Sequence, residues 1–309
     1  MLKNCRQIIK KICNKNNIKF KLLSKDWVIM LEKDNKTRFI TGCKFDLNNH
    51  AIGEVLDDKY ALYEVLSENN IPTVENNILY PSNNMNDYAL DANSSELVKK
   101  YFMHHNNNIV LKPCNGTCGL DVYHIVNIDE IDESLNKLFK KNESISYCPY
   151  YDIKNEYRVI ILNGNIEIVY KKEKPLVKGN GKDSIKRLLL NFNYEYFKDK
   201  LDDEVYDIIL EDGKLYEYNW KFNLSTGAKA SFDIESYDKE EIEKIVKDII
   251  DKIDLRFVSI DIIKTNNEFL VLEINSGVMM ENLINMVDDV KVVENIYEKA
   301  ILLMFDGIA

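Results

Sequence analysis

The sequence predicts a mixed α+β fold in which antiparallel hairpins alternate with amphipathic helices. Asn163-Gly164 joins two apolar runs, and Asn-Gly is a preferred central pair in tight β-hairpins. Asn266-Asn267 joins a second pair of apolar runs near the end of the chain. Before that pair, residues 238–254 place isoleucine and valine three and four positions apart, the spacing of one helical face. Hairpins and helices in this order predict antiparallel sheets that are covered by helices.

Apolar residues at helical spacing predict the helices, and short apolar or alternating runs predict the strands. The predicted helices cover residues 2–14, 57–69, 94–105, 129–141, 183–191, 238–254 and 290–304. The predicted strands cover residues 18–23, 27–32, 37–41, 109–111, 122–126, 144–148, 156–162, 166–170, 205–210, 214–220, 258–264 and 268–274.

Local signals set several of these boundaries. Pro72 ends the second helix, because a residue that precedes proline avoids the α region. Residues 93–96, Asn-Ser-Ser-Glu, have the pattern of a capping box and predict the start of the third helix. Asp212-Gly213 predicts a hairpin turn between the strands on either side of it.

The first helix is basic as well as amphipathic. Its apolar residues fall on one face, and lysines and an arginine lie elsewhere. Such a helix could contact a membrane or a partner, but packing on its own domain is the favoured interpretation.

Length and composition indicate a globular protein of about two domains. The chain has 309 residues, of which 45% are hydrophobic and 30% are charged. Its net charge of 41 − 51 = −10 disfavours a nucleic-acid partner, because phosphate-backbone binding normally needs a basic face. The sequence holds no apolar run near the ~20 residues that span a bilayer. The first residues lead into the amphipathic helix instead of an unbroken apolar signal segment, so a cytoplasmic location without membrane attachment is expected.

Six cysteines and four histidines offer no metal-binding pattern. The cysteines form no Cys-x-x-Cys pair and the histidines add no zinc spacing, so reduced thiols are expected.

Lys112 ends an apolar strand and precedes a glycine-containing loop, residues 114–119. Glycine lets the backbone approach phosphate oxygens, and the amide groups of such a loop can point at them. The lysine adds a positive charge at the end of the strand. The pattern indicates a nucleotide phosphate clamp on a β-hairpin. Taken alone, however, a glycine-containing hairpin loop is more often an ordinary turn.

Asp261, Glu273 and Asn275 are polar residues in two very apolar strands. Alternation along a strand places Glu273 and Asn275 on the same face and Asp261 opposite its apolar neighbours. Three oxygen donors on adjacent strands suit Mg²⁺, a hard cation. The alternative is a solvated sheet face, but lone polar groups among apolar residues need a partner.

Two further segments carry candidate ligand-binding groups. Glu156 and Arg158 share one strand face, where the arginine could grip a carboxylate or phosphate with two hydrogen bonds or form a surface ion pair. Residues 220–230 follow a strand and are rich in small residues and donors, which predicts a loop over an anionic ligand or an ordinary glycine turn.

Together these features resemble the ATP-grasp superfamily of carboxylate–amine ligases, from about residue 45 to the end of the chain. Asp58-Lys59 is similar to the "DK" entry motif, and Lys112-Pro113 with the following glycines is similar to the "KP…G…G" loop. Glu273-Ile274-Asn275 is similar to the "E-x-N" signature. Within the superfamily the chain is most similar to the ATP-grasp domain of cyanophycin synthetase and to glutathione-synthetase-like ligases, through residues 178–185.

The resemblance implies roles for individual residues. Arg158, Lys221 and Asn223 would be catalytic, and Asp261, Glu273 and Asn275 would bind two Mg²⁺ ions, which Mn²⁺ can replace. ATP would be held by Lys59, Lys112, Asn115, Gly116, Thr117, Cys118, Gly119, Cys148 and Tyr150, the last two in a hinge strand that holds adenine through backbone groups.

Two departures from the pattern matter. Lys221 stands where the "R-x-N-x-x-x-G" motif has arginine, and a lysine keeps the charge but loses the planar fork. Cyanophycin synthetase is also much longer and has a second ligase domain. The part of this chain before the resemblance is short for a substrate-binding domain.

The implied fold has two α/β subdomains whose antiparallel sheets clasp ATP, at residues 57–148 and 149–309, after a short N-terminal α/β domain at residues 1–56. The implied reaction joins a carboxylate and an amine through an acyl phosphate and releases ADP and phosphate. An amino acid or peptide is the expected substrate, and a homodimer is the expected assembly. Alternatives are an ATP-binding protein of the same fold without ligase activity and a small-molecule kinase.

Overall fold

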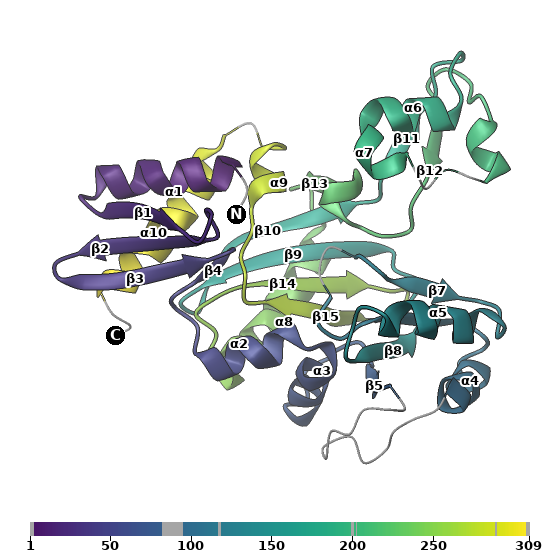
Figure 1. Cartoon of the computed structure of the whole chain (residues 1–309), viewed down its shortest axis with the longest axis horizontal. Coiled ribbons are helices and arrows are strands. Elements are labelled where there is room, and N and C mark those ends of the chain that lie inside the picture. Colours follow the sequence, from purple (N-terminus) through teal and green to yellow (C-terminus); the bar gives the residue numbers. More distant parts are fainter. Residues whose placement is uncertain are drawn as a thin grey trace. The chain divides into compact units, whose positions relative to one another are not determined.

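The computed structural model describes residues 3–81, 95–116, 119–198, 201, 203–287 and 289–306. The chain forms two compact units, which are treated separately below. The larger unit comprises Met1–Tyr170 and Phe232–Ala309, and the smaller unit is the segment Lys171–Ser231 between them. Helices and antiparallel sheets alternate along the chain, which confirms the predicted α+β class (Figure 1).

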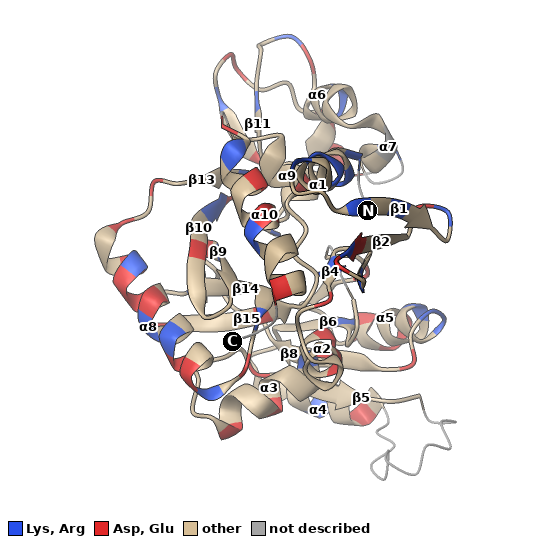
Figure 2. Cartoon of the chain, turned by 90° about the vertical axis from the view of Figure 1, so that its left-hand side faces the viewer, with Lys and Arg blue, Asp and Glu red and all other residues tan. Residues whose placement is uncertain are grey.

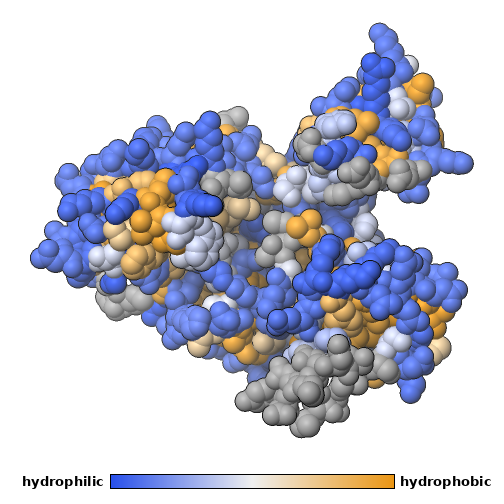
Figure 3. All heavy atoms as spheres, viewed as in Figure 1, coloured by the Kyte–Doolittle hydropathy of each residue, from blue (hydrophilic) through white to orange (hydrophobic). Residues whose placement is uncertain are grey.

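An antiparallel sheet with strand order β1-β2-β3-β4 begins the larger unit. Its strands are β1 (Lys19–Leu23), β2 (Val28–Lys33), β3 (Lys36–Thr41) and β4 (Lys44–Phe45). The first helix, α1 (Lys3–Lys15), and the last helix, α10 (Lys291–Asp306), pack together against this sheet (Figure 1). Trp27 and Phe39 are among its exposed apolar side chains, and apolar residues are visible in this region in Figure 3.

The basic helix α1 packs on its own unit, as favoured from the sequence. Its apolar face, which includes Ile9 and Ile12, is buried. Lys11 and Lys15 form ion pairs with Glu294 and Glu298 of α10 at 2.7 and 2.8 Å. The first and last helices of the chain are thereby joined by both apolar and charged contacts.

Glu281 anchors the beginning of α1. It opens the short helix α9 (Glu281–Ile284), and its carboxylate is buried. The two carboxylate oxygens accept hydrogen bonds from the backbone N–H groups of Asn4, at 3.0 Å, and Cys5, at 2.8 Å. A carboxylate suits this place, since the first N–H groups of a helix have no intrahelical partner and the N-terminus carries partial positive charge.

A second antiparallel sheet has strand order β5-β8-β6-β7. Its strands are β5 (Asn77–Leu79), β6 (Ile109–Pro113), β7 (Tyr123–Ile125) and β8 (Ile145–Pro149), and helices α4 (Ser95–His104) and α5 (Glu130–Phe139) pack on it. Val98, Phe102, Leu135 and Leu138 of these helices bury against Ile109 and Leu111 of β6. This packing covers one face of β6, the strand that carries Lys112.

The third sheet contains the long strands β9 (Asn155–Leu162), β10 (Asn165–Glu173), β14 (Phe257–Lys264) and β15 (Phe269–Asn275), in the order β10-β9-β14-β15. Its pairings confirm the hairpins predicted on either side of Asn163-Gly164 and Asn266-Asn267. Asn163 and Gly164 both have positive φ, at 48° and 75°, as a tight hairpin turn requires.

One face of this sheet is a continuous apolar core. Helices α2 (His50–Asp57), α3 (Lys59–Glu68) and α8 (Ser236–Lys252) supply residues to it, among them Leu62, Ile242 and Ile249. The outer face of α8 instead carries interleaved acidic and basic residues (Figure 2). The amphipathic pattern therefore decides which side of α8 faces the sheet.

The smaller unit has its own apolar cluster. It contains β11 (Leu176–Lys178) paired with β12 (Leu215–Glu217), helices α6 (Ile185–Phe192) and α7 (Tyr194–Phe197), the 3₁₀ turns η1 (Glu204–Asp207) and η2 (Leu224–Thr226), and β13 (Lys229–Ser231), which pairs with the last residues of β10. Leu189, Phe197 and Leu210 meet in its core.

The hairpin predicted for residues 205–210 and 214–220 is wrong. Residues 204–207 form η1, and β12 pairs with β11 from the other side of α6. Leu210 packs in the core of the smaller unit, so the apolar character of residues 205–210 reflects burial and not a strand. Periodicity cannot distinguish these outcomes for a run of this length.

Most other predicted elements are confirmed, with small changes at their ends. The helix predicted for 57–69 begins at Lys59, because the Asp58 side chain caps it by accepting from the N–H groups of Tyr60 and Ala61. Helix α2, which precedes it, was not predicted. The capping box predicted at 93–96 extends outside the described residues, and α4 begins at Ser95.

The described helices include none with the length and apolar character of a membrane span. The division at residues 56 and 148 stays a prediction.

Replacing Glu281 by alanine is expected to destabilise the protein by about 1–3 kcal/mol, since two backbone N–H groups at the start of α1 lose their acceptor. Urea unfolding measures the loss. Glu294→Ala is the control, because that carboxylate pairs with an exposed lysine, Lys11, and such pairs contribute about 0–1 kcal/mol. Equal losses in the two variants would contradict the assigned role of Glu281.

Candidate active site

Three charged side chains stand in a row across the third sheet. Asp261 of β14 is directly opposite Arg158 of β9 on one side and Glu273 of β15 on the other. Residues directly opposite each other in antiparallel strands project from the same face. The register of three strands therefore brings together residues that are more than a hundred positions apart in the sequence.

The row lies on the face of the sheet that is turned away from α8. Tyr157 and Val159, which flank Arg158, and Ile260 and Ile262, which flank Asp261, belong to the apolar core beneath that helix. Because successive side chains of a strand point to opposite faces, the charged row is on the other side.

A β-bulge sits beside the row. Asp261 opposes Glu273, whereas Ile262 opposes Val271, so Leu272 has no partner residue on β14. This extra residue places Glu273 next to Asp261 while the apolar residues beyond it keep their inward direction. Bulges are frequent next to functional sites, where they redirect a side chain.

Arg158 and Asp261 form a two-point ion pair. Arg158 Nε donates to Asp261 Oδ1 at 2.7 Å, and Nη2 donates to Oδ2 at 2.5 Å. Asp261 is only 1% exposed, so the guanidinium is in contact with a carboxylate that solvent barely reaches. Burial acts to lower the pKa of Arg158, but the charge of Asp261, with Tyr170 and Glu273, raises that pKa well above its ordinary value.

Asn275 completes the polar face of β15. Its Nδ2 donates to Glu273 Oε1 at 3.1 Å, and it lies opposite Ser259 of β14. Asp261, Glu273 and Asn275 therefore offer carboxylate and amide oxygens from one face of two adjacent strands. That donor set fits Mg²⁺.

Lys59 links the start of α3 to the loop after β6. Its Nζ donates to the carbonyl oxygen of Gly116 at 2.7 Å and to that of Cys114 at 3.3 Å. Burial lowers the pKa of Lys59, Lys112 lowers it further, and Glu273 opposes the shift. These electrostatic interactions place Lys59 close to Glu273 of the carboxylate row and close to Lys112.

Lys112 is 7% exposed and lies opposite Ser146 of β8. Within the part of the chain that the structure describes, its ammonium group forms no hydrogen bond or ion pair. The ammonium group still reaches solvent, since it is not among the buried side-chain atoms without a partner, so this cation can receive an anionic ligand.

The loop after Lys112 is described in part. Asn115 and Gly119 are exposed, and Gly119 has a positive φ of 63°. Gly116 packs so closely on Pro113 that a Cβ there would lie 3.1 Å from the proline ring. Thr117 and Cys118, two of the predicted ligand-binding residues, lie outside the described residues.

The predicted adenine hinge lies at the end of β8. Cys148 is buried opposite Val110. Tyr150 stacks on His124, with ring centroids 3.9 Å apart, and its backbone N–H donates to the carbonyl oxygen of Asn108. Burial lowers the pKa of His124, which favours the neutral ring. The sequence analysis did not select His124, because no motif or spacing distinguishes a single histidine in a predicted strand.

Lys221 and Asn223 belong to the smaller unit. Asn223 Oδ1 accepts from the backbone N–H of Ser225 at 2.9 Å and from its hydroxyl group at 2.8 Å, so this side chain shapes the turn η2. Lys221 Nζ lies 5.6 Å from the centroid of the Trp220 ring. Gly227 ends the turn with φ of 108°, and a Cβ there would collide with the hydroxyl of Tyr218.

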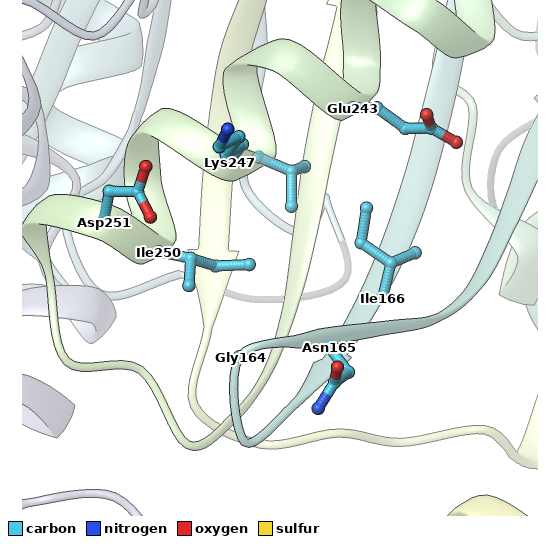
Figure 4. Close-up of a pocket in the computed structure, with 8 residues that line it drawn as sticks. Gly164, Asn165, Ile166, Glu243, Lys247, Ile250 and Asp251 are labelled. Carbon is cyan, nitrogen blue, oxygen red and sulfur yellow. The ribbon is translucent and has the colours of Figure 1, made fainter.

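A shallow cavity of about 390 Å³ lies elsewhere in the larger unit (Figure 4). It is lined by residues of α8, including Glu243 and Lys247, and by the turn between β9 and β10. Because α8 covers the apolar face of the sheet, this cavity is on the opposite side from Arg158 and Asp261. It is therefore separate from the candidate active site.

Comparison of the sequence with models of protein families and with curated proteins finds no match. Solved structures do match. D-alanyl-alanine synthetase A from Vibrio cholerae covers 97% of this chain and 93% of its own length, with a TM-score of 0.58 and 12% identity. A D-alanine–D-alanine ligase from Bacillus anthracis covers 86% of this chain and 71% of its own length, with a TM-score of 0.56 and 15% identity.

A bifunctional glutathione synthetase from Pasteurella multocida covers 97% of this chain at a TM-score of 0.54 and 15% identity, and this chain spans 43% of that protein's length. This chain has the ATP-grasp fold. The predicted fold is thus confirmed. In the larger unit, strand register brings Arg158, Asp261, Glu273 and Asn275 together, and Lys59 lies close to Glu273 and to Lys112.

The lowered pKa of Lys59 predicts a dependence of stability on pH. A lysine whose folded pKa is lowered binds fewer protons in the folded than in the unfolded state, between that value and 10.5. Stability contributed by Lys59 should therefore rise with pH in that window and level off above it. We expect the free energy of unfolding of the native protein, relative to Lys59→Met, to increase as the pH approaches 10.5. Urea unfolding of both proteins over a pH series tests this; a flat or falling difference contradicts it.

Gly227→Ala is expected to destabilise the smaller unit by about 1–3 kcal/mol or more, because the added Cβ requires a strained backbone and displaces Tyr218. Gly53→Ala serves as the control, since a Cβ at that helical position meets nothing within 4 Å. It should stabilise the protein by about 0.5–1 kcal/mol. Denaturant unfolding with tryptophan fluorescence compares them, and a neutral Gly227→Ala would contradict the described turn.

Proposed function

We propose that this chain is an ATP-dependent ligase that joins a carboxylate to an amine. The observation that carries the proposal is the meeting of Lys59 and Lys112 with the row Arg158, Asp261 and Glu273. Cations suited to phosphates, on α3 and β6, lie close to oxygen donors suited to Mg²⁺ on β14 and β15. The ATP-grasp fold of the chain and of D-alanine–D-alanine ligase supports the same conclusion.

In this proposal ATP is a substrate held by the larger unit. Lys112 would bind phosphate oxygens, and the loop with Asn115, Gly116 and Gly119 would cover them and exclude water. Lys59 would position that loop through its bonds to the carbonyl oxygens of Cys114 and Gly116, and would add positive charge. The backbone at Cys148 and Tyr150 would contact adenine.

Asp261, Glu273 and Asn275 would hold Mg²⁺. When bound, Mg²⁺ neutralises phosphate charge, as in phosphoryl transfer generally. The protein's own part is to position the reacting groups and to present cationic side chains to the charge that develops. Arg158 would serve in that way, and the catalytic role of Lys221 and Asn223, which belong to the smaller unit, stays a prediction.

The proposed reaction has two steps. A substrate carboxylate oxygen attacks the γ-phosphorus of ATP, the bond to the β-phosphate oxygen breaks, and an acyl phosphate and ADP result. An amine then attacks the acyl carbon, loses a proton and expels inorganic phosphate, which forms the amide. The names of the matching ligases point to amino acids and short peptides as substrates.

The test is release of ADP and phosphate by the purified protein with Mg-ATP and pools of amino acids and short peptides, with the products weighed by mass spectrometry. A product lighter by one water than its two substrates is expected. Lys112→Ala and Glu273→Ala should each lower turnover more than about 100-fold while the protein stays folded. Lys112 would itself bring positive charge to the phosphates, and Glu273 would hold the Mg²⁺ that does so.

Lys247→Ala, in the cavity on the far side of the sheet, is the matched lysine control and should keep full activity. Near-normal turnover of either site variant would contradict the proposed site. A phosphorylated product without an amide would indicate a kinase, and ATP binding without turnover on any pool would indicate a binding protein.

A further inference from the structure

Arg158 occupies both oxygens of a proposed metal ligand. Its Nε and Nη2 each donate to a different oxygen of Asp261, at 2.7 and 2.5 Å. Asp261 is buried, so the guanidinium is the counter-ion that makes a charge at this depth tolerable. The positive charge of Arg158 therefore offsets the negative charge of Asp261.

A divalent cation on Asp261 would have to share that carboxylate with Arg158. Magnesium sits about 2.0–2.1 Å from a carboxylate oxygen, closer than the arginine nitrogens do. The ion and the guanidinium would then be like charges on one buried group, and poorly screened by solvent. Glu273 also interacts electrostatically with Arg158, so the charge of this arginine reduces the attraction of both carboxylates for a cation.

Phosphates offer Arg158 an alternative partner. A guanidinium binds phosphate oxygens with the same two-point geometry that it uses for a carboxylate. Lys112 lies near Lys59, and Lys59 interacts with Glu273, so the anion-binding side of the site is close to the row. A nucleotide bound there can draw the guanidinium away from Asp261.

We infer that Arg158 and a divalent cation compete for Asp261, so that the nucleotide-free protein binds the cation weakly and bound phosphates release the carboxylate for it. Arg158 is then a positioning residue that couples the two binding events. Such coupling is reciprocal, because whatever factor the nucleotide adds to cation affinity the cation adds to nucleotide affinity. The inference rests on the proposed function in its use of a nucleotide, but its first test needs none.

The first test is the affinity of the full-length protein for Mn²⁺ without nucleotide, measured from the electron paramagnetic resonance signal of free Mn²⁺. Arg158→Gln removes the guanidinium that occupies both oxygens of Asp261, so Mn²⁺ should bind this variant at least about tenfold more tightly than the native protein, within the usual range of coupling between sites. Mn²⁺ should also raise the melting temperature of Arg158→Gln and leave that of the native protein nearly unchanged.

Lys264→Gln is the matched control. Lys264 lies on the same strand, β14, and pairs at 2.6 Å with Asp238, which is 1% exposed like Asp261. Asp238 lies in the first turn of α8, and its other partner is the hydroxyl of Tyr157. The second carboxylate near Lys264, that of Glu235 at 4.0 Å, is 80% exposed, so Lys264→Gln does not uncover a buried pair of carboxylates. Lys264→Gln should lose stability without gaining affinity for Mn²⁺, and Arg158→Gln with Asp261→Asn should lose the gain.

The inference is overturned if Arg158→Gln binds Mn²⁺ no more tightly than the native protein, or if Lys264→Gln gains as much. Should Arg158→Gln fail to fold, Arg158→Lys takes its place; it keeps the charge but loses the fork, so a smaller gain is expected. The native protein alone supplies a further test, since a non-hydrolysable ATP analogue should tighten Mn²⁺ binding and this effect should shrink in either variant.

The two proposals fail in distinguishable ways. If Mg-ATP binds and is turned over but the native protein holds Mn²⁺ equally well with and without nucleotide, the competition is wrong and the proposed function stands. If no nucleotide binds, the proposed function is wrong, and the affinities of the native and variant proteins for Mn²⁺ alone still decide whether Arg158 competes for Asp261.

Discussion

The register of β14 between β9 and β15 is the constraint on which the candidate site depends. A shift of one residue in either pairing would turn Asp261 into the apolar core and separate it from Arg158 and Glu273. The apolar residues on the other face prevent that shift, because Ile260, Ile262 and their neighbours would then lose their burial under α8. Packing on one face therefore fixes the chemistry on the other.

Burial gives this site its charge requirements. Asp261 is nearly inaccessible, so it needs an opposite charge or a strong hydrogen bond, whereas the ammonium group of Lys112 still reaches solvent at the end of a buried stem. Arg158 meets that need for Asp261 inside the protein, whereas the structure describes no such partner for Lys112. The carboxylate is satisfied and the lysine is suited to an added anion, which is the asymmetry expected of a site that receives phosphates.

The errors of the sequence predictions have physical causes. An apolar run predicted a strand at residues 205–210. In the structure Leu210 is buried in the core of the smaller unit, and β12 pairs with β11, which precedes α6 in the chain. Helix α2 is short and was missed, and the next helix begins at Lys59 instead of residue 57 because the Asp58 side chain caps it. His124 of β7 stacks on Tyr150, which directly follows β8, and neither segment of the sequence indicates this contact between residues far apart in the chain.

The sequence by itself determined the α+β class, most helices and strands, and the residue types available for binding phosphate and metal, because these follow from local periodicity, turn residues and short motifs. The tertiary structure decided that Arg158 pairs with Asp261, that Lys59 holds the loop at Gly116, and that Lys221 and Asn223 belong to a separate compact unit. Strand register and the packing of helices on sheets set those contacts, and both depend on residues far apart in the chain.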